Sequence, residues 1–262
     1  MHATGQLAVT WSEMIARTRW SALRQTVNDL FEVIHEDADL LVVNKPAGLV
    51  CHPTKTDERS SLIGRVRLYL GNGEGRLVNR LDRETSGLVL VAKSGAAAGE
   101  LGKLIERSAV RKEYAAIVHG FVAPEEFTID EPLGKDEQSI VAIKDCVRPD
   151  GSASQTHARV ERRFISDEAE FTLLKVEPRS GRKHQIRIHL AHVGHPIVGD
   201  KIYGGDEQIY LRFVRCEMTD ADRARMLLSN HALHAAQLNF RWRQRDWSFA
   251  ARPTEEFHKF LS

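Results

Sequence analysis

The 262-residue sequence lacks a long apolar run, since no stretch approaches the ~20 residues that a membrane-spanning helix requires. The N-terminus also lacks the basic start, apolar core and small-residue cleavage site of a secretory signal. We therefore expect a soluble protein that is not exported and has no membrane partner.

Cysteine is scarce. The three cysteines, Cys51, Cys146 and Cys216, are far apart, odd in number and without Cys-x-x-Cys spacing. This pattern argues against both a disulfide framework and a zinc knuckle. We expect reduced thiols and a cytoplasmic location.

An excess of charge of one sign is also missing, because 37 Lys and Arg oppose 36 Asp and Glu for a net charge of +1. The sum therefore does not indicate a nucleic-acid partner, and the distribution of charge matters more. A solvated mixed surface and a basic face on a neutral molecule both fit the four basic clusters: Arg107, Arg111 and Lys112; Arg159, Arg162 and Arg163; Arg179, Arg182, Lys183 and Arg187; Arg241, Arg243 and Arg245.

Several motifs for covalent catalysis are absent. The sequence has no Gly-x-Ser-x-Gly nucleophile elbow, no Walker A loop and no cysteine with an evident histidine partner. Acyl transfer and phosphoryl transfer of the usual kinds are therefore disfavoured.

What the sequence does contain is a series of short apolar runs bounded by turn residues, with helical periodicity between some of them. Strands are predicted after Phe31 and at 40–43, 88–92, 110–119, 156–164, 171–176, 235–240 and 247–250. Helices are predicted from an N-cap at Ser60 through Leu70, from a cap at Ser94 to about Arg107, over 184–193 and after Pro253. No linker or repeat divides this pattern, which predicts an α+β catalytic domain over 31–262 and an appended helical extension over 1–30.

One stretch, Asn79 to Ser94, combines a charged loop with a strand and reads NRLDRETSGLVLVAKS. Asp82 lies in the loop, and an apolar strand follows the Ser86-Gly87 turn signal. A loop held against a buried strand is a usual place for catalytic groups. An ordinary surface loop with a local ion pair fits the spacing equally well.

Four histidines lie close together at His184, His189, His192 and His195. His184 and His189 are five residues apart, whereas a helical zinc pair needs a spacing of four, and Arg187 would place a fixed positive charge beside an ion. We expect no metal here, and instead packing or hydrogen bonding to RNA or to neighbouring loops.

The Asn79–Ser94 stretch is one of four motifs, which in chain order are VVNKPAGLVCHP, NRLDRETSGLVLVAKS, RKEYAAIVHG and SGRKHQIRIHLAHVGHPIVGDKIYG. This series resembles the RluA-type family of pseudouridine synthases. The resemblance runs from about Phe31 to the C-terminus and includes the late LHAAQLNF element. It implies isomerisation of uridine to pseudouridine in a folded ribosomal or transfer RNA, without a cofactor. It also implies a bent mixed, mostly antiparallel sheet flanked by helices, with a central catalytic cleft.

Three residues match the family's catalytic positions. The resemblance implies that Asp82 is the catalytic aspartate, acting as a nucleophile or as a base, and the sequence leaves both roles open. Tyr114 would stack on the extracted uracil, and Arg187 would pair with the aspartate. From pattern alone, Tyr114 reads as a core aromatic and Arg187 as a helix-surface arginine.

Other residues match positions around the cleft. Arg80 would replace the flipped nucleotide in the RNA stack. The remaining expected RNA contacts are Arg83, Arg182, Lys183 and His184, of which Arg182 and Lys183 are the candidates for phosphate. The expected supporting residues are Asn44, Lys45, His52, Asn79 and Thr85. Thr85 and Ser86 are predicted to hold the loop by side-chain to backbone hydrogen bonds.

The match has two departures. Asn79 stands where the family usually has histidine, so we expect activity to survive while loop packing or RNA stacking changes. Many relatives carry a small RNA-binding domain ahead of the catalytic one, and residues 1–30 are too few for it.

We expect a monomer with no obligatory protein partner. The rival interpretations are an RNA-binding or assembly protein on this fold without catalysis, and a metal-dependent hydrolase that uses the histidines.

Overall fold

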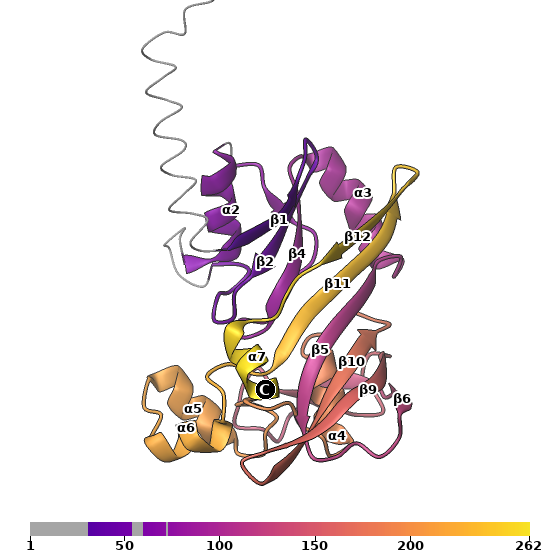
Figure 1. Cartoon of the computed structure of the whole chain (residues 1–262). Helices are drawn as coiled ribbons and strands as arrows, with labels where there is room; N and C mark the ends of the chain where they lie inside the picture. The colour runs from indigo at the N-terminus through magenta and orange to yellow at the C-terminus, as the bar shows by residue number, and fades with distance from the viewer. Residues whose placement is uncertain (1–30, 54–59, 72) are drawn as a thin grey trace, which may run out of the picture.

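A ten-stranded, mostly antiparallel sheet runs through the molecule (Figure 1). The computed structural model describes residues 31–53, 60–71 and 73–262. The strand order is β1-β2-β4-β11-β5-β10-β9-β6, with β3 paired to β4, β12 paired to β11 and a separate β7-β8 pair. The strands are β1 (Glu32–Glu36), β2 (Leu40–Lys45), β3 (Arg76–Leu77), β4 (Ser86–Ala92), β5 (Arg111–His119), β6 (Glu126–Asp130), β7 (Leu133–Lys135), β8 (Asp145–Val147), β9 (Gln155–Ser166), β10 (Ala169–Pro178), β11 (Leu233–Trp242) and β12 (Arg245–Ala250).

Six helices lie in the described part of the chain (Figure 1). They are α2 (Leu62–Leu70), α3 (Gly95–Glu106), α4 (Gln185–His192), α5 (Glu207–Arg215), α6 (Asp220–Met226) and α7 (Glu255–Leu261). None of these helices is long and apolar enough to cross a bilayer.

Strand β4 is buried along its whole length because helices cover both of its faces. Alternate residues of β4, Val89 and Val91, pack in one cluster with Val66 of α2. Their neighbours Leu88 and Leu90 pack in another cluster with residues of α3. A strand covered on both faces reads as a continuous apolar run rather than an alternating one, which is the pattern seen here. The loop before β4 therefore rests on a rigid base.

Strands β4 and β11 pair in parallel, with His234 opposite Ser86 and Ala235 opposite Gly87. A parallel pairing places the starts of the two strands side by side, so the loop before β4 meets the segment before β11. Gly87 permits this contact because its φ is +115° and a Cβ there would lie 2.4 Å from the carbonyl oxygen of Ala235. The two halves of the sheet join at this point.

The predicted fold class is confirmed. The predicted cap at Ser94 is confirmed as well, since its side chain accepts a hydrogen bond from the Ala97 N–H at the start of α3. The predicted cap at Ser60 is wrong by one residue: Ser61 accepts from the Gly64 N–H. Helices α5 and α6, which lie together outside the main body of the sheet (Figure 1), were not predicted. The sequence of α6 is mostly polar, whereas α5 has apolar residues at helical spacing that the sequence reasoning missed. The predicted 1–30 extension falls outside the described residues.

Candidate active site

A cavity of about 590 Å³ lies where the two halves of the sheet meet. It is lined by the loop before β4, by one face of β5, by the segment from β10 into α4 and by the start of β11. Asp82, Tyr114 and Arg187 all line it, although they are separated by 32 to 105 positions in the chain. The fold thus brings together the three residues that the sequence singled out.

Arg187 and Asp82 form an ion pair at the wall of this cavity. The Arg187 Nη1 donates to Asp82 Oδ2 at 2.9 Å, and the arginine side chain is only 5% exposed, against 29% for the aspartate. Burial, the largest single effect, works against ionisation of Asp82, but the charge and the hydrogen bond of Arg187, with smaller contributions from other neighbours, together outweigh it and hold the pKa of the carboxyl below its ordinary value. Asp82 is therefore an anion at neutral pH with one side open to the cavity.

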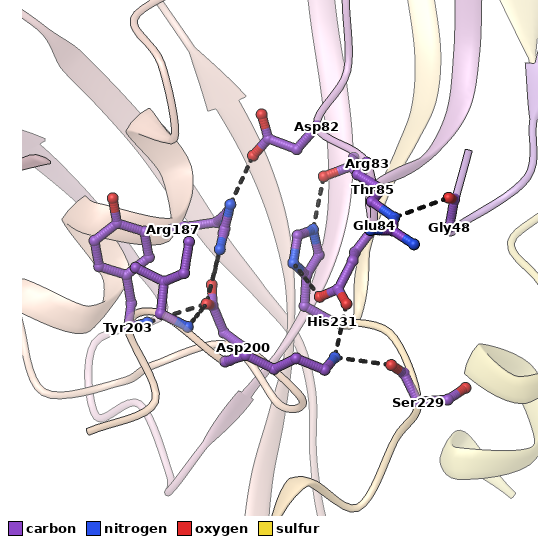
Figure 2. A network of polar contacts seen from close by, with 12 residues as sticks. Gly48, Asp82, Arg83, Glu84, Thr85, Arg187, Asp200, Tyr203, Ser229 and His231 are labelled. Carbon is purple, nitrogen blue, oxygen red and sulfur yellow. Dashed lines mark hydrogen bonds and ion pairs between the residues drawn. The ribbon is translucent and has the colours of Figure 1, made fainter. Parts of the chain in front are cut away.

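Arg187 is in turn fixed from behind by Asp200 (Figure 2). Its Nε and Nη2 donate to the two oxygens of Asp200 at 2.6 and 2.8 Å, and its guanidinium lies 5.1 Å from the centre of the Tyr203 ring. Asp200 also accepts the backbone N–H groups of Ile202 and Tyr203. This bidentate pairing uses Nε and Nη2 and leaves Nη1 to donate to Asp82. Sequence reasoning missed Asp200, although it lies within the fourth motif, in VGDKIYG.

Tyr114 projects into the cavity from β5, where it also packs against two of the apolar clusters. Burial raises the pKa of its hydroxyl, and the negative charge of Asp82 raises it further. The phenol is therefore neutral at physiological pH. Its ring offers a flat apolar surface beside the carboxylate.

His184 adopts a left-handed conformation with φ 55° just before α4. Its Nδ1 forms a hydrogen bond of 2.9 Å with the Tyr203 hydroxyl, and its Nε2 lies 3.8 Å from Asp82 Oδ2. Burial and the nearby Arg187 lower its pKa to about 4, so the ring is neutral at pH 7. It contributes a polar wall to the cavity without adding charge.

Buried polar groups hold the loop that carries Asp82. The Lys45 Nζ, fully buried, donates to the carbonyls of Pro46, Leu49 and Arg83, and burial lowers its pKa to about 8. The Asn79 side chain bridges two backbone groups of β4: its Nδ2 donates to the Leu88 carbonyl at 3.2 Å, and its Oδ1 accepts from the Leu90 N–H at 2.7 Å.

Thr85 and Ser86 hold the loop in a way that differs from the prediction. Thr85 Oγ1 bonds to His231 Nε2 at 2.7 Å, and Ser86 Oγ bonds to His234 Nδ1 at 2.9 Å. These are side-chain to side-chain bonds across the β4-β11 junction, so the predicted backbone partners are wrong. The cause is the parallel pairing, which places both histidines opposite the loop.

A second buried ion pair ties the same loop to the segment after Asp200. The Lys201 Nζ donates to Glu84 at 2.7 Å and to the Ser229 carbonyl at 2.8 Å (Figure 2). His231 lies 3.6 Å from Glu84, and burial lowers its pKa to about 3, so it is neutral. Sequence reasoning missed both Lys201 and His231.

Comparison with known proteins identifies the family. The sequence profile of the family described as RNA pseudouridylate synthase matches residues 39–192. The chain belongs to this family.

Relatives in the family cover different shares of the chain. An uncharacterized RNA pseudouridine synthase of Bacillus subtilis, YlyB, is 36% identical over 66% of this chain and 57% of its own length. Ribosomal large subunit pseudouridine synthase D of Vibrio cholerae is 31% identical over 90% of this chain and 69% of its own length. The chain spans 57% to 63% of the length of the first three curated relatives.

A solved structure has the same fold. Human RNA pseudouridylate synthase domain containing 4 superposes with a TM-score of 0.70 over 94% of this chain and 96% of its own, at 21% identity. The resemblance to pseudouridine synthases in sequence is thus confirmed by the family match, and the fold by this similarity.

All five residues expected to contact RNA line the cavity, including His184, described above. Arg80 lies at its exposed rim, and Arg83 donates to the Gly48 carbonyl while its guanidinium lies 5.4 Å from the centre of the Phe213 ring. The other two cations expected to contact RNA, Arg182 and Lys183, line the cavity too.

Three of the five expected supporting residues line the cavity, and two do not. His52, Asn79 and Thr85 line the cavity. Lys45 lies beneath the loop, and Asn44 is the exception: its Nδ2 donates to Glu32 and to the Arg252 carbonyl, away from the cavity. The alternation of side chains along β2 sends Asn44 to the opposite face from Lys45.

Three of the four histidines near α4 bond to separate partners. His184 bonds to Tyr203, His189 to Thr156 and the Glu131 carbonyl, and His195 to the His119 carbonyl. Within the described ranges, no group of three or more His, Cys, Asp and Glu side chains is arranged to hold a metal ion.

Proposed function

We propose that this protein isomerises uridine to pseudouridine in RNA, with Asp82 as the catalytic carboxylate. The observation that carries the proposal is an ionised carboxylate, fixed by Arg187, facing a cavity of about 590 Å³ beside Tyr114. Membership of the pseudouridylate synthase family supports the same reaction. A binding protein without catalysis would have no use for a buried arginine that positions a partly buried acid at a cavity.

The reaction exchanges one bond for another and requires no oxidant or reductant. The N1–C1′ bond of uridine breaks, the uracil turns, and a C5–C1′ bond forms. The proton on C5 is lost and N1 gains one, so the composition is unchanged and nothing is oxidised or reduced. Asp82 acts as a nucleophile or as a base, and both roles require the anionic form that Arg187 maintains. We propose that no cofactor takes part.

The glycosidic bond of a stacked nucleotide is out of reach, so the target must leave the RNA helix at a cost of a few kcal/mol. The cavity volume falls within the usual range of small-ligand sites, roughly 300–1,000 Å³, and is adequate for one nucleotide. Stacking on Tyr114 offsets about 1–3 kcal/mol of the extraction cost. Arg80 at the rim fills the gap that is left in the RNA, while Arg182 and Lys183 contact phosphates.

We propose structured ribosomal or transfer RNA as the substrate, in the cytoplasm, with the protein acting as a monomer. Ribosomal RNA is the first candidate, because curated relatives are named as ribosomal large subunit pseudouridine synthase D. The three cysteines are free thiols, in keeping with a reducing compartment.

The experiment uses ribosomal and transfer RNA transcribed with uridine tritiated at C5. Because C5 loses its proton during isomerisation, the purified protein should release tritium to water, and nucleoside analysis should detect pseudouridine. Mapping of pseudouridines in cells with and without the gene then gives the target. RNA binding without tritium release from any of these RNAs would favour the non-catalytic RNA-binding alternative.

A further inference from the structure

Lys112 is a half-buried cation that has no protein partner within the described ranges. Among the described residues, none forms a hydrogen bond or an ion pair with its ammonium, and burial lowers its pKa. Basic residues elsewhere in the described chain are commonly paired: Arg163 pairs with Glu125, and Arg243 pairs with Asp39 and Glu100. A desolvated ammonium without a partner costs stability.

The position of Lys112 places it inside the substrate site. It is two residues before Tyr114 on β5, so the two side chains point to the same face of the strand. Both line the catalytic cavity. Lys112 also lines a second cavity of about 180 Å³, which shares Ile105, Pro178, Ser180 and Gly181 with the first. The two cavities are therefore adjacent, and Lys112 lies where they meet.

The second cavity is positively charged overall. It is lined by Arg111, Lys112 and Arg179 against one carboxylate, Glu177. Arg111 forms a bidentate pair with Glu177 at 2.5 and 3.0 Å, and Arg179 lies 3.7 Å from the same carboxylate. Glu177 is therefore already paired with two arginines. It does not balance the charge of Lys112, which lies between the two cavities. Such a site favours a group that carries a permanent negative charge.

We propose that Lys112 binds a phosphate of the RNA backbone next to the target uridine, and that the second cavity holds the adjoining nucleotide. The proposal rests on the proposed function, since it identifies how the substrate continues out of the catalytic cavity. A phosphodiester is anionic at all physiological pH values and accepts charge-assisted hydrogen bonds from an ammonium. Contacts of this kind position the nucleic acid without reading its sequence.

The test compares Lys112→Met, Lys112→Arg and a matched control, Lys259→Met. Lys259 lies on α7, is 74% exposed and pairs with the exposed Glu255, so the control removes the same charge outside the cavities. The probe is a fluorescently labelled RNA stem-loop with a uridine-rich loop. Its Kd is measured over a range of potassium chloride concentrations, alongside the melting temperature of each variant and tritium release at limiting and saturating RNA.

We expect Lys112→Met to weaken RNA binding about five- to tenfold at low salt, uniformly across loop sequences. The slope of log K against log salt should fall by about 0.8, the contribution of one phosphate contact. Lys112→Arg should restore both, and Lys259→Met should match wild type. The melting temperature of Lys112→Met should equal or exceed that of wild type, because an unpaired buried charge has been removed. Tritium release at limiting RNA should fall with the affinity.

The proposal is overturned if Lys112→Met has the same affinity and salt slope as Lys259→Met. A lower melting temperature with unchanged affinity would assign a structural role and overturn it as well, as would a loss of turnover at saturation with unchanged affinity. If wild type binds the RNA but releases no tritium from any substrate, the proposed function fails while the binding data still decide the role of Lys112. If wild type binds no RNA, both proposals fall.

Discussion

Replacement of Asp200 by asparagine should destabilise the protein far more than the same change at Asp82. The Arg187 side chain is 5% exposed and donates two bonds to Asp200, at 2.6 and 2.8 Å, while the Asp200 side chain is fully buried. An asparagine has one acceptor oxygen, and its amide group would face an N–H donor, so at least one bond is lost together with the charge. Breaking a buried ion pair costs about 3–5 kcal/mol.

Asp82→Asn provides the comparison. Asp82 is 29% exposed and makes one bond of 2.9 Å to Arg187, which keeps its pairing with Asp200 in this variant. We expect a loss of about 0.5–1.5 kcal/mol, the net contribution of a single hydrogen bond. Urea unfolding followed by circular dichroism measures both variants against wild type. The reasoning is refuted if Asp200→Asn loses no more free energy of unfolding than Asp82→Asn.

Three further predictions concern the loop, the strand junction and pH. Asn79→Ala should lower the free energy of unfolding by about 1–3 kcal/mol, because two backbone groups of β4 lose their buried partners, and urea unfolding would contradict this if it showed no change. Gly87→Ala should lower the free energy of unfolding by at least about 2 kcal/mol, since the added Cβ would overlap the backbone of β11. The control is Gly99→Ala on α3, where nothing lies within 4 Å of the added Cβ, and it should be neutral or stabilising. Equal effects of the two substitutions on the free energy of unfolding would refute the argument. Asp82 and Asp200 have lowered pKa values in the folded state, so their contribution to stability is present above the unfolded pKa of about 3.9 and is lost as pH falls below it. The urea midpoint of wild type should therefore fall steeply below about pH 4, and a curve for Asp200→Asn that is equally steep would contradict the assignment.

Much of the fold was predictable from local signals. The continuous apolar run of β4 and the cap at Ser94 are short-range features, and the structure has both. Helix α6 was harder to predict because its sequence is mostly polar, whereas α5 was missed although Ile209, Tyr210 and Phe213 recur at helical spacing. Their caps at Asp206 and Thr219 were the available signal.

The site was predictable only where motifs marked it. Asp82, Tyr114 and Arg187 were found through the series of motifs, whereas spacing alone left Tyr114 and Arg187 as a core aromatic and a surface arginine. Asp200 and His231 were missed because their roles depend on contacts across 13 and 146 positions, to Arg187 and to Thr85. Periodicity carries no information about such contacts. A buried acid beside a buried arginine becomes recognisable only after the chain has folded.

The central claim is that the Asp82 carboxylate performs the isomerisation, and one comparison tests it most directly. Pseudouridine formation in a single turnover is measured at saturating RNA for wild type and for Asp82→Asn, together with the Kd of each for the same RNA. The account predicts that the variant binds RNA within a few fold of wild type and forms no detectable pseudouridine. Turnover by Asp82→Asn at a rate near that of wild type would contradict it.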